Sequence, residues 1–331
     1  MFALERCIFV LQKILRAHRM NVFNPLEQYV SSTQSILTIG TFDGVHVGHQ
    51  KIIRALVEEA HQKGLLANVL TFFPHPRMVL KKESNIKLID TLEEKEALLR
   101  QLGVDNLIIH PFSKAFSQLS ALEFTRDILV EKLNIAKLII GYDHRFGKNR
   151  EATVEDLIRL GVKYNFEVKV LPPEQVDAIT VSSTKIRHTI ADGDMEQTQA
   201  FLGRPFAITG KVVRGDQIGR TINFPTANLA ISDSYKMIPT EGVYIVRSAL
   251  EGSTCFGMMN IGNRPTVAGT QTTVEVHFFD LDKDLYGATL KVELLKKIRA
   301  EKKFDSLASL QKQIAKDQEI CLETINENNW H

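Results

Sequence analysis

The chain has 331 residues, which exceeds the size of one ordinary domain and fits two. Its hydrophobic content of 44%, charged content of 24% and net charge of +2 are typical of a globular protein and argue against bulk binding of nucleic acid or of a membrane surface. No apolar run reaches the roughly 18–20 residues of a membrane span. The three cysteines (Cys7, Cys255, Cys321) are widely spaced and odd in count, which argues against a disulfide framework and favours the reducing cytoplasm.

Residues 1–19 mix apolar and basic side chains in the manner of a basic amphipathic helix. The segment lacks the small-residue cleavage site of a signal peptide. Met20 offers a second start of translation. We expect residues 1–19 to be an extension of little functional weight.

Residues 36–171 alternate apolar strands with helices. The predicted strands are Ile36–Gly40, Leu66–Phe72, Leu107–Ile109, Lys137–Gly141 and Val168–Leu171. Between them, Gly64 follows a helix that runs to Lys63, and capping boxes open helices at Thr91 and Ser120. This alternation predicts an α/β domain with a parallel sheet covered on both faces, in which ligands bind beyond the carboxyl ends of the strands.

The segment Ile36–Lys51 joins the first of these strands to a helix through a tight turn that contains Asp43 and Gly44. Free backbone N–H groups and the positive end of the helix dipole point the same way there, which suits a phosphate. His46 and His49 share one face of the first helical turn. Two imidazoles beside a phosphate predict chemistry at phosphorus; the alternative is two surface histidines at a helix start.

Other segments of this half carry weaker signals. Ser182–Arg187 places hydroxyls and two cations at a helix start, which suits a triphosphate but also an ordinary N-cap with solvated cations. Asp143 follows a predicted strand and is a candidate ligand contact, whereas we expect Phe146 to pack, with a stacking role as the alternative. His75, in the rigid loop Phe73–Pro76, is as readily structural as functional.

After about residue 190 the pattern changes. Residues 183–191 and 194–202 predict two short helices, and the chain then becomes rich in strands punctuated by glycine and proline. The predicted strands are Phe206–Val213, Val243–Ala249, Cys255–Ile261, Thr272–Asp280 and Thr289–Leu295. They favour a small antiparallel barrel or sandwich, which an amphipathic helix closes at the end of the chain. We expect domains at residues 1–188 and 189–331.

Two features of the second half could carry chemistry. The loop Gly215–Asn228 ends in polar groups, and the oxygens of Thr226 and Asn228 suit Mg²⁺ that leans on substrate phosphates, unless the loop is a simple turn. In the strand around Glu275, Val274 and Val276 take one face and Glu275 the other. A mid-strand carboxylate faces solvent or a polar pocket, and in a pocket it is a natural general base for a hydroxyl. The pattern alone favours solvent.

Seven ordered motifs together resemble the family of bacterial bifunctional riboflavin kinase/FAD synthetases, over about residues 33 to 320. They are Gly40–His49, Phe73–Pro76, Gly141–Gly147, Ser182–Arg187, Phe224–Asn228, Asn260–Thr266 and Glu275–His277. The resemblance implies an N-terminal FMN adenylyltransferase of Rossmann-like nucleotidyltransferase type and a C-terminal riboflavin kinase built on a β-barrel. Riboflavin plus ATP would give FMN, and FMN plus ATP would give FAD and diphosphate, with Mg²⁺ in both reactions.

The resemblance also implies roles for single residues. His46 and His49 would stabilise the ATP phosphates during adenylylation, Glu275 would take the proton of the ribityl hydroxyl, and Thr226 and Asn228 would bind Mg²⁺. The expected contacts to ATP or its phosphates are Gly40, Phe42, Gly48, Ser183, Thr184, Arg187, Gly215 and Arg220. The expected flavin or nucleotide pockets involve Asp143, Asn260 and Arg264.

This chain departs from the usual motifs at five positions. It has Thr41 where the family usually has Asn, Phe73 for Glu, His144 for an aromatic residue, Ile218 for Arg and Asn223 for Gly. Ile218 and Asn223 lie in the expected phosphate loop of the kinase and bear on its geometry. None of the five removes a proposed catalytic group.

Two other functions compete with this interpretation. One is a monofunctional nucleotidyltransferase whose second half only binds a flavin or another ligand, which the presence of Thr226, Asn228 and Glu275 opposes. The other is a nucleic-acid binder or synthetase-like fragment, which the low net charge opposes. We therefore expect small-molecule flavins and ATP as partners, with no nucleic acid and no membrane; the sequence does not specify an oligomeric state.

Overall fold

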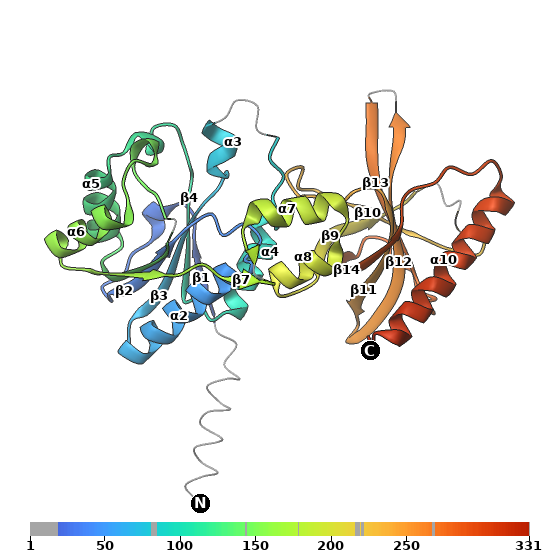
Figure 1. Ribbon diagram of the computed structural model, residues 1–331, viewed down its shortest axis with the longest axis horizontal. Helices are drawn as coiled ribbons and strands as arrows, with labels where there is room; N and C mark the ends of the chain where they lie inside the picture. Colours follow the sequence, from blue (N-terminus) through green and yellow to red (C-terminus); the bar gives the residue numbers. More distant parts are fainter. Residues whose placement is uncertain are drawn as a thin grey trace, which may run out of the picture. The chain divides into compact units, whose positions relative to one another are not determined.

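A computed structural model describes residues 19–80, 85–142, 144–177, 179–215, 219, 222–266 and 269–330, with residues 264–266 and 269–271 described by their backbone alone (Figure 1). The chain forms two compact units. The first comprises the described residues up to Ile86 and Asp90–Val181, and the second comprises Lys87–Ile89 and the chain from Ser182 onward. The expected boundary between residues 188 and 189 stays a prediction. None of the helices in the described ranges is long and apolar enough to cross a membrane.

The first unit is built on a six-stranded sheet, and every neighbouring pair in it is parallel. In spatial order the strands are β1 (Asn21–Phe23), β4 (Asn106–His110), β3 (Leu66–Phe72), β2 (Ser35–Ile39), β5 (Ile135–Gly141) and β6 (Glu167–Leu171). The five strands predicted from apolar runs are present. The short edge strand β1 escaped prediction because three residues carry no readable period.

Helices cover both faces of this sheet, as the strand–helix alternation predicted. They are α2 (Val47–Lys63), α3 (Pro76–Leu80), α4 (Leu92–Gln101), α5 (Ala121–Glu123) with its π-type continuation Phe124–Lys132, and α6 (Val154–Tyr164). Leu37 and Ile39 of β2 pack with residues of α6 and the π-type helix, whereas Ile36 packs with Leu56 of α2. Alternate residues of one strand thus bury opposite faces.

The strand order places a topological switch point between β2 and β5. The chain proceeds from β2 to β3 and β4 on one side, and β5 leads to β6 on the other. The connections after β2 and β5 therefore leave in opposite directions and open a crevice at the carboxyl ends of these two strands. The Gly40–His49 motif follows β2 at this edge.

A row of amides, of which Asn68 and Asn106 are buried, crosses the opposite, amino-terminal edge of the sheet. Asn21 donates to Asn106 at 3.0 Å, Asn106 donates to Asn68 at 2.8 Å, and Asn68 donates to the hydroxyl of Tyr29 at 2.8 Å. The three asparagines are register partners on β1, β4 and β3. A shift of one strand by one residue would leave these buried groups unpaired, so the row fixes the register.

The second unit contains a closed antiparallel barrel, so the barrel prediction is confirmed and the sandwich alternative is wrong. The strands run in the order β10 (Ala227–Ala230), β13 (Gly269–Phe278), β12 (Ser253–Thr266), β11 (Gly242–Leu250), β14 (Thr289–Arg299) and β9 (Phe206–Val213). The predicted helices α7 (Ser183–Asp192) and α8 (Met195–Leu202) precede it, and α10 (Leu307–Glu327) follows it. β10 escaped prediction because it has only four residues, in a loop-like context.

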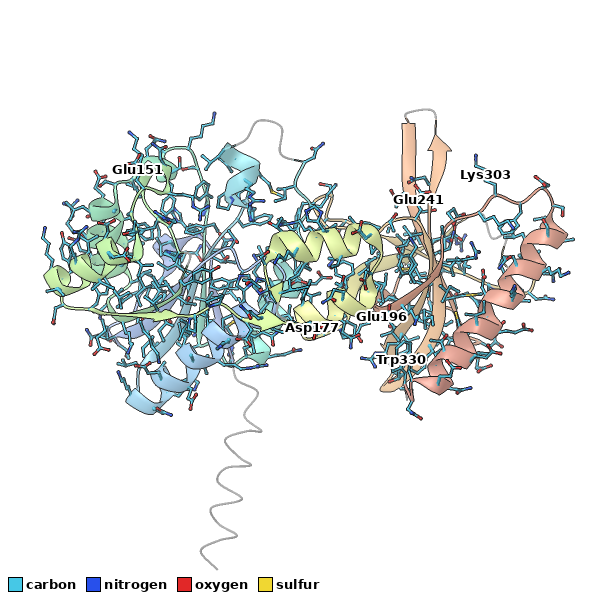
Figure 2. The ribbon with its side chains drawn as sticks, viewed as in Figure 1. Glu151, Asp177, Glu196, Glu241, Lys303 and Trp330 are labelled. Atoms are coloured by element: carbon cyan, nitrogen blue, oxygen red, sulfur yellow. The ribbon has the colours of Figure 1, made fainter. Side chains whose placement is uncertain are left out.

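An ion pair and an apolar cluster hold α10 against the barrel. The guanidinium of Arg299 on β14 contacts both carboxylate oxygens of Asp317, at 2.7 to 3.0 Å, and Asp317 is almost fully buried. Cys321 and Ile325 of α10 pack in the same cluster as Trp330, which Figure 2 labels near the end of the chain. The position of this helix is therefore fixed both by burial and by a bidentate pair.

The segment Lys87–Ile89 adds a short piece of backbone pairing to the second unit. Leu88 donates its N–H to the carbonyl of Tyr235 at 2.7 Å and accepts from the N–H of Met237 at 2.8 Å. The buried ammonium of Lys236 donates to the carbonyl of Ile89 at 2.7 Å and lies 4.6 Å from the ring centroid of Phe206. Carbonyl and ring together compensate a charge that is otherwise costly to bury.

A network of charges centred on Glu59 joins α2 to strands β5 and β6 in the first unit. The carboxylate of Glu59 accepts from Lys137 at 2.7 Å, Lys63 at 2.9 Å and Lys169 at 3.1 Å. The hydrogen bond from Lys137 is the largest cause of a pKa of Glu59 lowered from 4.5 to about 2, against the opposing effect of burial. The network stabilises the packing of the helix on the sheet in the charged state of Glu59.

We predict that Glu59→Gln destabilises the first unit by about 1–2 kcal/mol at neutral pH, after allowance for solvent screening. The folded pKa of about 2 lies below 4.5, so the stabilisation is complete above about pH 4.5 and is lost as the pH falls from there toward 2. Thermal unfolding followed by circular dichroism at neutral and acid pH measures the difference from the unchanged chain. Glu96→Gln, in an exposed pair with Arg100, is the control. A difference that does not shrink on acidification would contradict the prediction.

Candidate functional site

The predicted pair of histidines lies at the start of α2, at the switch point of the sheet. His46 is the N-cap, and its Nδ1 accepts a hydrogen bond from the backbone N–H of His49 at 3.4 Å. The two rings stack with centroids 3.6 Å apart and planes 19° apart, so the expected shared face is confirmed. Because Nδ1 of His46 is an acceptor, neutral His46 carries its proton on Nε2.

The turn that carries these histidines has an unusual backbone. Phe42 and Val45 have φ of +45° and +35°, and Gly44 has φ of +87°. Left-handed conformations are costly for a β-branched residue such as valine, and such strain concentrates at functional sites. A Cβ at Gly40 would lie 3.1 Å from the Phe42 ring, and one at Gly48 would lie 3.3 Å from the His46 ring. Both glycines thus allow a ring to lie against the backbone.

The electrostatics of the turn keep His49 neutral. Burial, then the neighbouring His46 and Lys95, hold the pKa of His49 well below its ordinary value. Its Nδ1 is buried and has no hydrogen-bond partner among the described residues. A neutral imidazole beside free helix N–H groups can donate a hydrogen bond to a phosphate oxygen without adding a titrating charge.

Lys95 also belongs to this site, although it was not predicted from the sequence. It lies on α4, is 4% exposed, and its ammonium donates to the carbonyl of Thr41 at 2.8 Å. Burial lowers the pKa of Lys95, and the carboxylates of Asp43 and Asp90 oppose that effect. Its position could have been recognised in the sequence, because Lys95 lies four residues before Leu99 and therefore on the face of the helix that packs in the core.

A patch of aromatic rings surrounds the carboxyl ends of β3 and β4. Phe116 lies 4.3 Å from the ring of His110 and 5.6 Å from that of Phe72, measured between centroids. The patch continues through Phe112, Phe124, Phe146 and His144. The Nδ1 of His110 is buried without a partner among the described residues, and burial lowers the pKa of His110. Phe146 and His144 were singled out in the sequence for other reasons, and the patch itself was not predicted because its rings come from several separate segments of the chain.

The other predicted residues of this half have different outcomes. Asp143 lies outside the described residues. His75 accepts from the N–H of Arg77 at 3.1 Å at the start of α3, which is a structural role. His144 stacks on Phe146 with planes 23° apart, so its imidazole takes the place of the aromatic residue usual in the family.

The helix start at Ser182 belongs to the second unit. Ser182 is the N-cap of α7 and accepts from the N–H of Lys185 at 3.4 Å, while Ser183 and Thr184 occupy the first turn. The Nε of Arg187 donates to the carbonyl of Lys87 at 3.0 Å. The expected N-cap is confirmed, and the expected contacts of these residues with a triphosphate stay a prediction.

In the barrel, strand register brings three predicted residues into one row. Glu275 on β13 is the direct partner of Asn228 on β10 and of Asn260 on β12. Directly opposed residues project to the same face of a sheet. The hydroxyl of Thr226 donates to a carboxylate oxygen of Glu275 at 3.2 Å. Glu275 is partly buried in this polar row, and its expected role as a general base stays a prediction.

Glycines and one left-handed asparagine shape the loop beside this row. A Cβ at Gly215 would lie 2.4 Å from the Asn228 amide, and one at Gly219 would lie 2.2 Å from the carbonyl of Phe224. Asn223 has φ of +64°, a conformation that glycine adopts freely and asparagine tolerates best among other residues. Asn223 is therefore compatible with the left-handed backbone at this position, where the resemblance led us to expect glycine. Arg220, Ile218 and the side chain of Arg264 lie outside the described residues.

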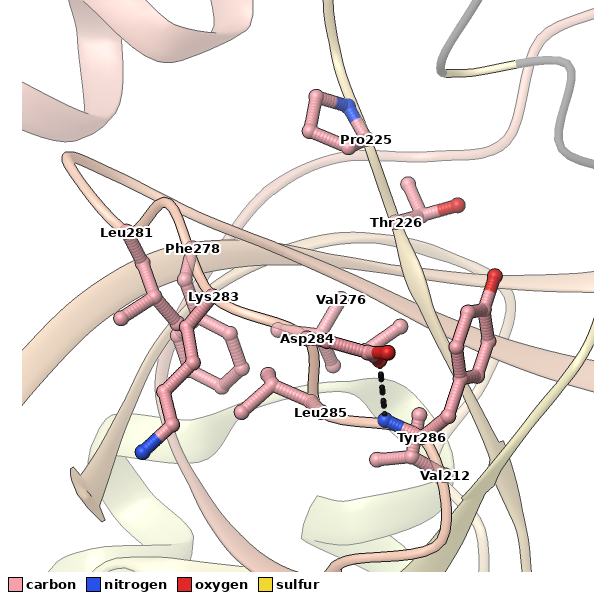
Figure 3. Close-up of a pocket in the computed structure, with 11 residues that line it drawn as sticks. Val212, Pro225, Thr226, Val276, Phe278, Leu281, Lys283, Asp284, Leu285 and Tyr286 are labelled. Atoms are coloured by element: carbon pink, nitrogen blue, oxygen red, sulfur yellow. Dashed lines mark hydrogen bonds between the residues drawn. The ribbon is translucent and has the colours of Figure 1, made fainter. Parts of the chain in front are cut away.

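A cavity of about 80 Å³ adjoins the row at Thr226 (Figure 3). Apolar and aromatic side chains form most of its wall: Val212, Pro225, Val276, Phe278, Leu281, Leu285 and Tyr286. Asp284 accepts from the N–H of Tyr286 at 2.9 Å and fixes the turn that carries this ring. Thr226 thus has Glu275 on one side and, on the other, a cavity whose lining also includes Lys283 and Asp284.

A further carboxylate lies near the row. Glu301 accepts a hydrogen bond from Asn260, and burial together with the charges of Glu241 and Glu275 raises the pKa of Glu301. No group of three or more histidine, cysteine or acidic side chains in the described part of the chain could hold a metal ion. A cation at Thr226 and Asn228 would therefore depend on oxygens from its substrate and from water.

Comparison with known proteins supports both halves. Residues 29–185 match the family model of FAD synthetase, and residues 202–325 match that of riboflavin kinase. The bifunctional riboflavin kinase/FMN adenylyltransferase of Escherichia coli (strain K12) is 39% identical over 284 residues, which is 86% of this chain and 90% of that protein. The same-named protein of Bacillus subtilis (strain 168) is 38% identical over 294 residues, 87% of this chain and 92% of its own.

A solved structure has the same fold. The crystal structure of a protein described as a macrolide-efflux protein from Streptococcus pneumoniae matches with a TM-score of 0.84 and 32% identity, over 94% of this chain and 99% of that one. The two family models, the relatives that match along most of their length and the shared fold lead to one conclusion. This chain belongs to the family of bifunctional riboflavin kinase/FMN adenylyltransferases, and it makes FMN from riboflavin and FAD from FMN.

Proposed function

We propose that the two reactions use separate machinery: the His46–His49 turn transfers the adenylyl group, and the row centred on Glu275 phosphorylates riboflavin. The observation that supports this division is that the stacked histidines lie in the first unit, whereas the hydrogen bond between Thr226 and Glu275 lies in the second. Ser183, Thr184 and Arg187 stay candidates for holding the triphosphate of the adenylylation reaction.

In adenylyl transfer, the phosphate of FMN attacks the α-phosphorus of ATP and diphosphate leaves. Negative charge gathers on the phosphoryl oxygens in the transition state, so fixed hydrogen-bond donors are the main source of catalysis. The N–H groups at the start of α2, the Nε2–H of His46 and the neutral His49 supply such donors. The aromatic patch from Phe72 to Phe146 supplies flat surfaces for the isoalloxazine ring.

In the kinase reaction, Glu275 takes the proton of the ribityl 5′-hydroxyl while its oxygen attacks the γ-phosphorus and ADP leaves. Asn228 and Asn260 flank the carboxylate, and Thr226 donates to it, which fixes its orientation. The cavity beyond Thr226, in which Phe278 and Tyr286 lie beside polar groups, is our candidate site for the purine ring of ATP. If the chain were a monofunctional nucleotidyltransferase, the row centred on Glu275 would have no function.

Mg²⁺ fits the oxygens present at the kinase row. Thr226 and Asn228 would hold it together with substrate phosphates and water, as neutral oxygens suit this ion. When bound, Mg²⁺ would neutralise the charge that develops on the phosphates. We place the enzyme in the cytoplasm, in agreement with the free thiols of Cys255 and Cys321.

We predict that Glu275→Gln lowers the rate of FMN formation by about 10²–10⁴-fold, because the amide cannot accept the hydroxyl proton. Conversion of supplied FMN to FAD by the same chain should stay unchanged. Chromatography of flavin products from riboflavin, ATP and Mg²⁺ measures both. Glu251→Gln, at an exposed turn of the same barrel, is the control. Loss of FAD formation from FMN in a folded Glu275→Gln chain would refute the division of labour.

We predict the reverse pattern for His46→Ala. It removes a donor and the N-cap of α2, so conversion of FMN to FAD should fall by about 10²–10³-fold while riboflavin phosphorylation persists. The same product assay checks it, with His61→Ala at the exposed far end of α2 as the control. Normal adenylylation by His46→Ala would show that the turn is not the site.

We predict that Asn228→Ala raises the Mg²⁺ concentration for half-maximal riboflavin kinase activity by about tenfold or more, because one neutral ligand is lost. The Mg²⁺ dependence of adenylylation should stay unchanged, since that reaction uses the other unit. Titration of both activities with Mg²⁺ on the same preparation measures this. Equal shifts in the two dependences would contradict a metal position at Asn228.

A further inference from the structure

A buried ammonium lies beneath the turn that carries the two histidines. Lys95 reaches from α4 to the carbonyl of Thr41 at 2.8 Å and is 4% exposed. A buried charge is unfavourable unless opposite charges compensate it. Asp43 of the turn and Asp90, just before α4, are both buried and supply that compensation. A neutral side chain could fill the same space without these costs, so the charge itself calls for a role.

The carbonyl that Lys95 holds begins the strained part of the turn. Thr41 precedes Phe42, and the backbone then passes through positive φ at Phe42, Gly44 and Val45. The hydroxyl of Thr71 on β3 donates to the same carbonyl at 3.3 Å. Strained conformations persist only where the surroundings fix them, and two donors on one carbonyl fix the entry to this turn.

The orientation of that carbonyl determines where Phe42 lies, and Phe42 contacts His49. The ring of Phe42 packs on Gly40 and meets the ring of His49 edge-on, with centroids 5.2 Å apart. On its other side, His49 stacks on His46. His49 is therefore held between two rings, one of which is positioned by the carbonyl that Lys95 binds.

We propose that Lys95 is a positioning residue for adenylyl transfer, which fixes the Thr41 carbonyl and thereby the turn that orients Phe42 and His49. The proposal rests on the assignment of adenylyl transfer to this turn. Lys95 contacts the backbone of the site, so its loss acts on the rate of the reaction through geometry. Its positive charge also opposes protonation of His49, since both groups lie close together in a buried environment.

The variant Lys95→Met keeps the length of the side chain and removes the ammonium. We expect it to lower kcat for conversion of FMN to FAD by about 10–100-fold, as a small misplacement of catalytic groups does, with KM for FMN changed by less than about threefold. Riboflavin phosphorylation by the same chain should be unchanged. Arg100→Met removes an exposed cation from the same helix and is the matched control.

A second measurement separates positioning from mere support of the fold. His49 faces the ring of His46, the ring of Phe42 and the charge of Lys95, and Asp43 and Asp90 are the carboxylates that act on that lysine. Removal of the ammonium eases protonation of His49, so the acid limb of the kcat profile should move to higher pH in Lys95→Met. A folded Lys95→Met chain with unchanged kcat, or with reduced kcat and an unmoved acid limb, overturns the proposal.

If Lys95→Met does not fold, Thr71→Val tests the same carbonyl. Thr71 is fully buried, and valine keeps its shape while removing the donor to Thr41. The proposal expects a several-fold loss of adenylylation kcat with little change in KM, and full kcat overturns it. His49→Ala separates the assignment of the site from the role of Lys95. Normal adenylylation by His49→Ala refutes the assignment of the site. An inactive His49→Ala chain together with a fully active Lys95→Met chain refutes only the role of Lys95.

Discussion

Strand pairing is the constraint on which both sites depend. In the first unit, parallel pairing of β2 with β5 creates the switch point at which the His46–His49 turn lies. In the second unit, antiparallel register places Glu275 between Asn228 and Asn260. A slip of one residue in the barrel would turn Glu275 to the opposite face from Asn228 and Asn260. The catalytic geometry is therefore a consequence of the same contacts that fold each unit.

Much of this could be predicted because the signals are local. The alternation of strands and helices, the capping boxes and the glycine turns predicted the parallel sheet, and apolar alternation around Glu275 predicted its outward face. The row across β10, β13 and β12 could not be predicted, since register depends on pairing between distant segments and β10 is too short to recognise. The aromatic patch could not be predicted either, since its rings come from separate segments that only the fold brings together.

Buried polar groups mark both the stable and the reactive parts of the molecule. In the asparagine row at the amino-terminal edge of the sheet, the side chains form hydrogen bonds with one another. Arg299 and Asp317 pair in the same way, and these pairs fix structural elements in place. At the carboxyl edge, His49 and His110 each keep a buried nitrogen without a partner among the described residues. Such unmet groups are costly to fold and are suited to a ligand that completes them. Lys95 shares features of both groups: its buried charge has a hydrogen-bond partner, and that partner is the backbone of the reactive turn.

The division of two reactions between two sets of side chains is tested most directly by mixing two defective chains. Glu275→Gln and His46→Ala are combined with riboflavin, ATP and Mg²⁺, and flavin products are separated. If the two sets act independently, the mixture forms FAD, His46→Ala alone stops at FMN, and Glu275→Gln alone leaves riboflavin unchanged. FAD formed from riboflavin by either chain alone, or no FAD from the mixture, would contradict the assignment of the two reactions to these residues.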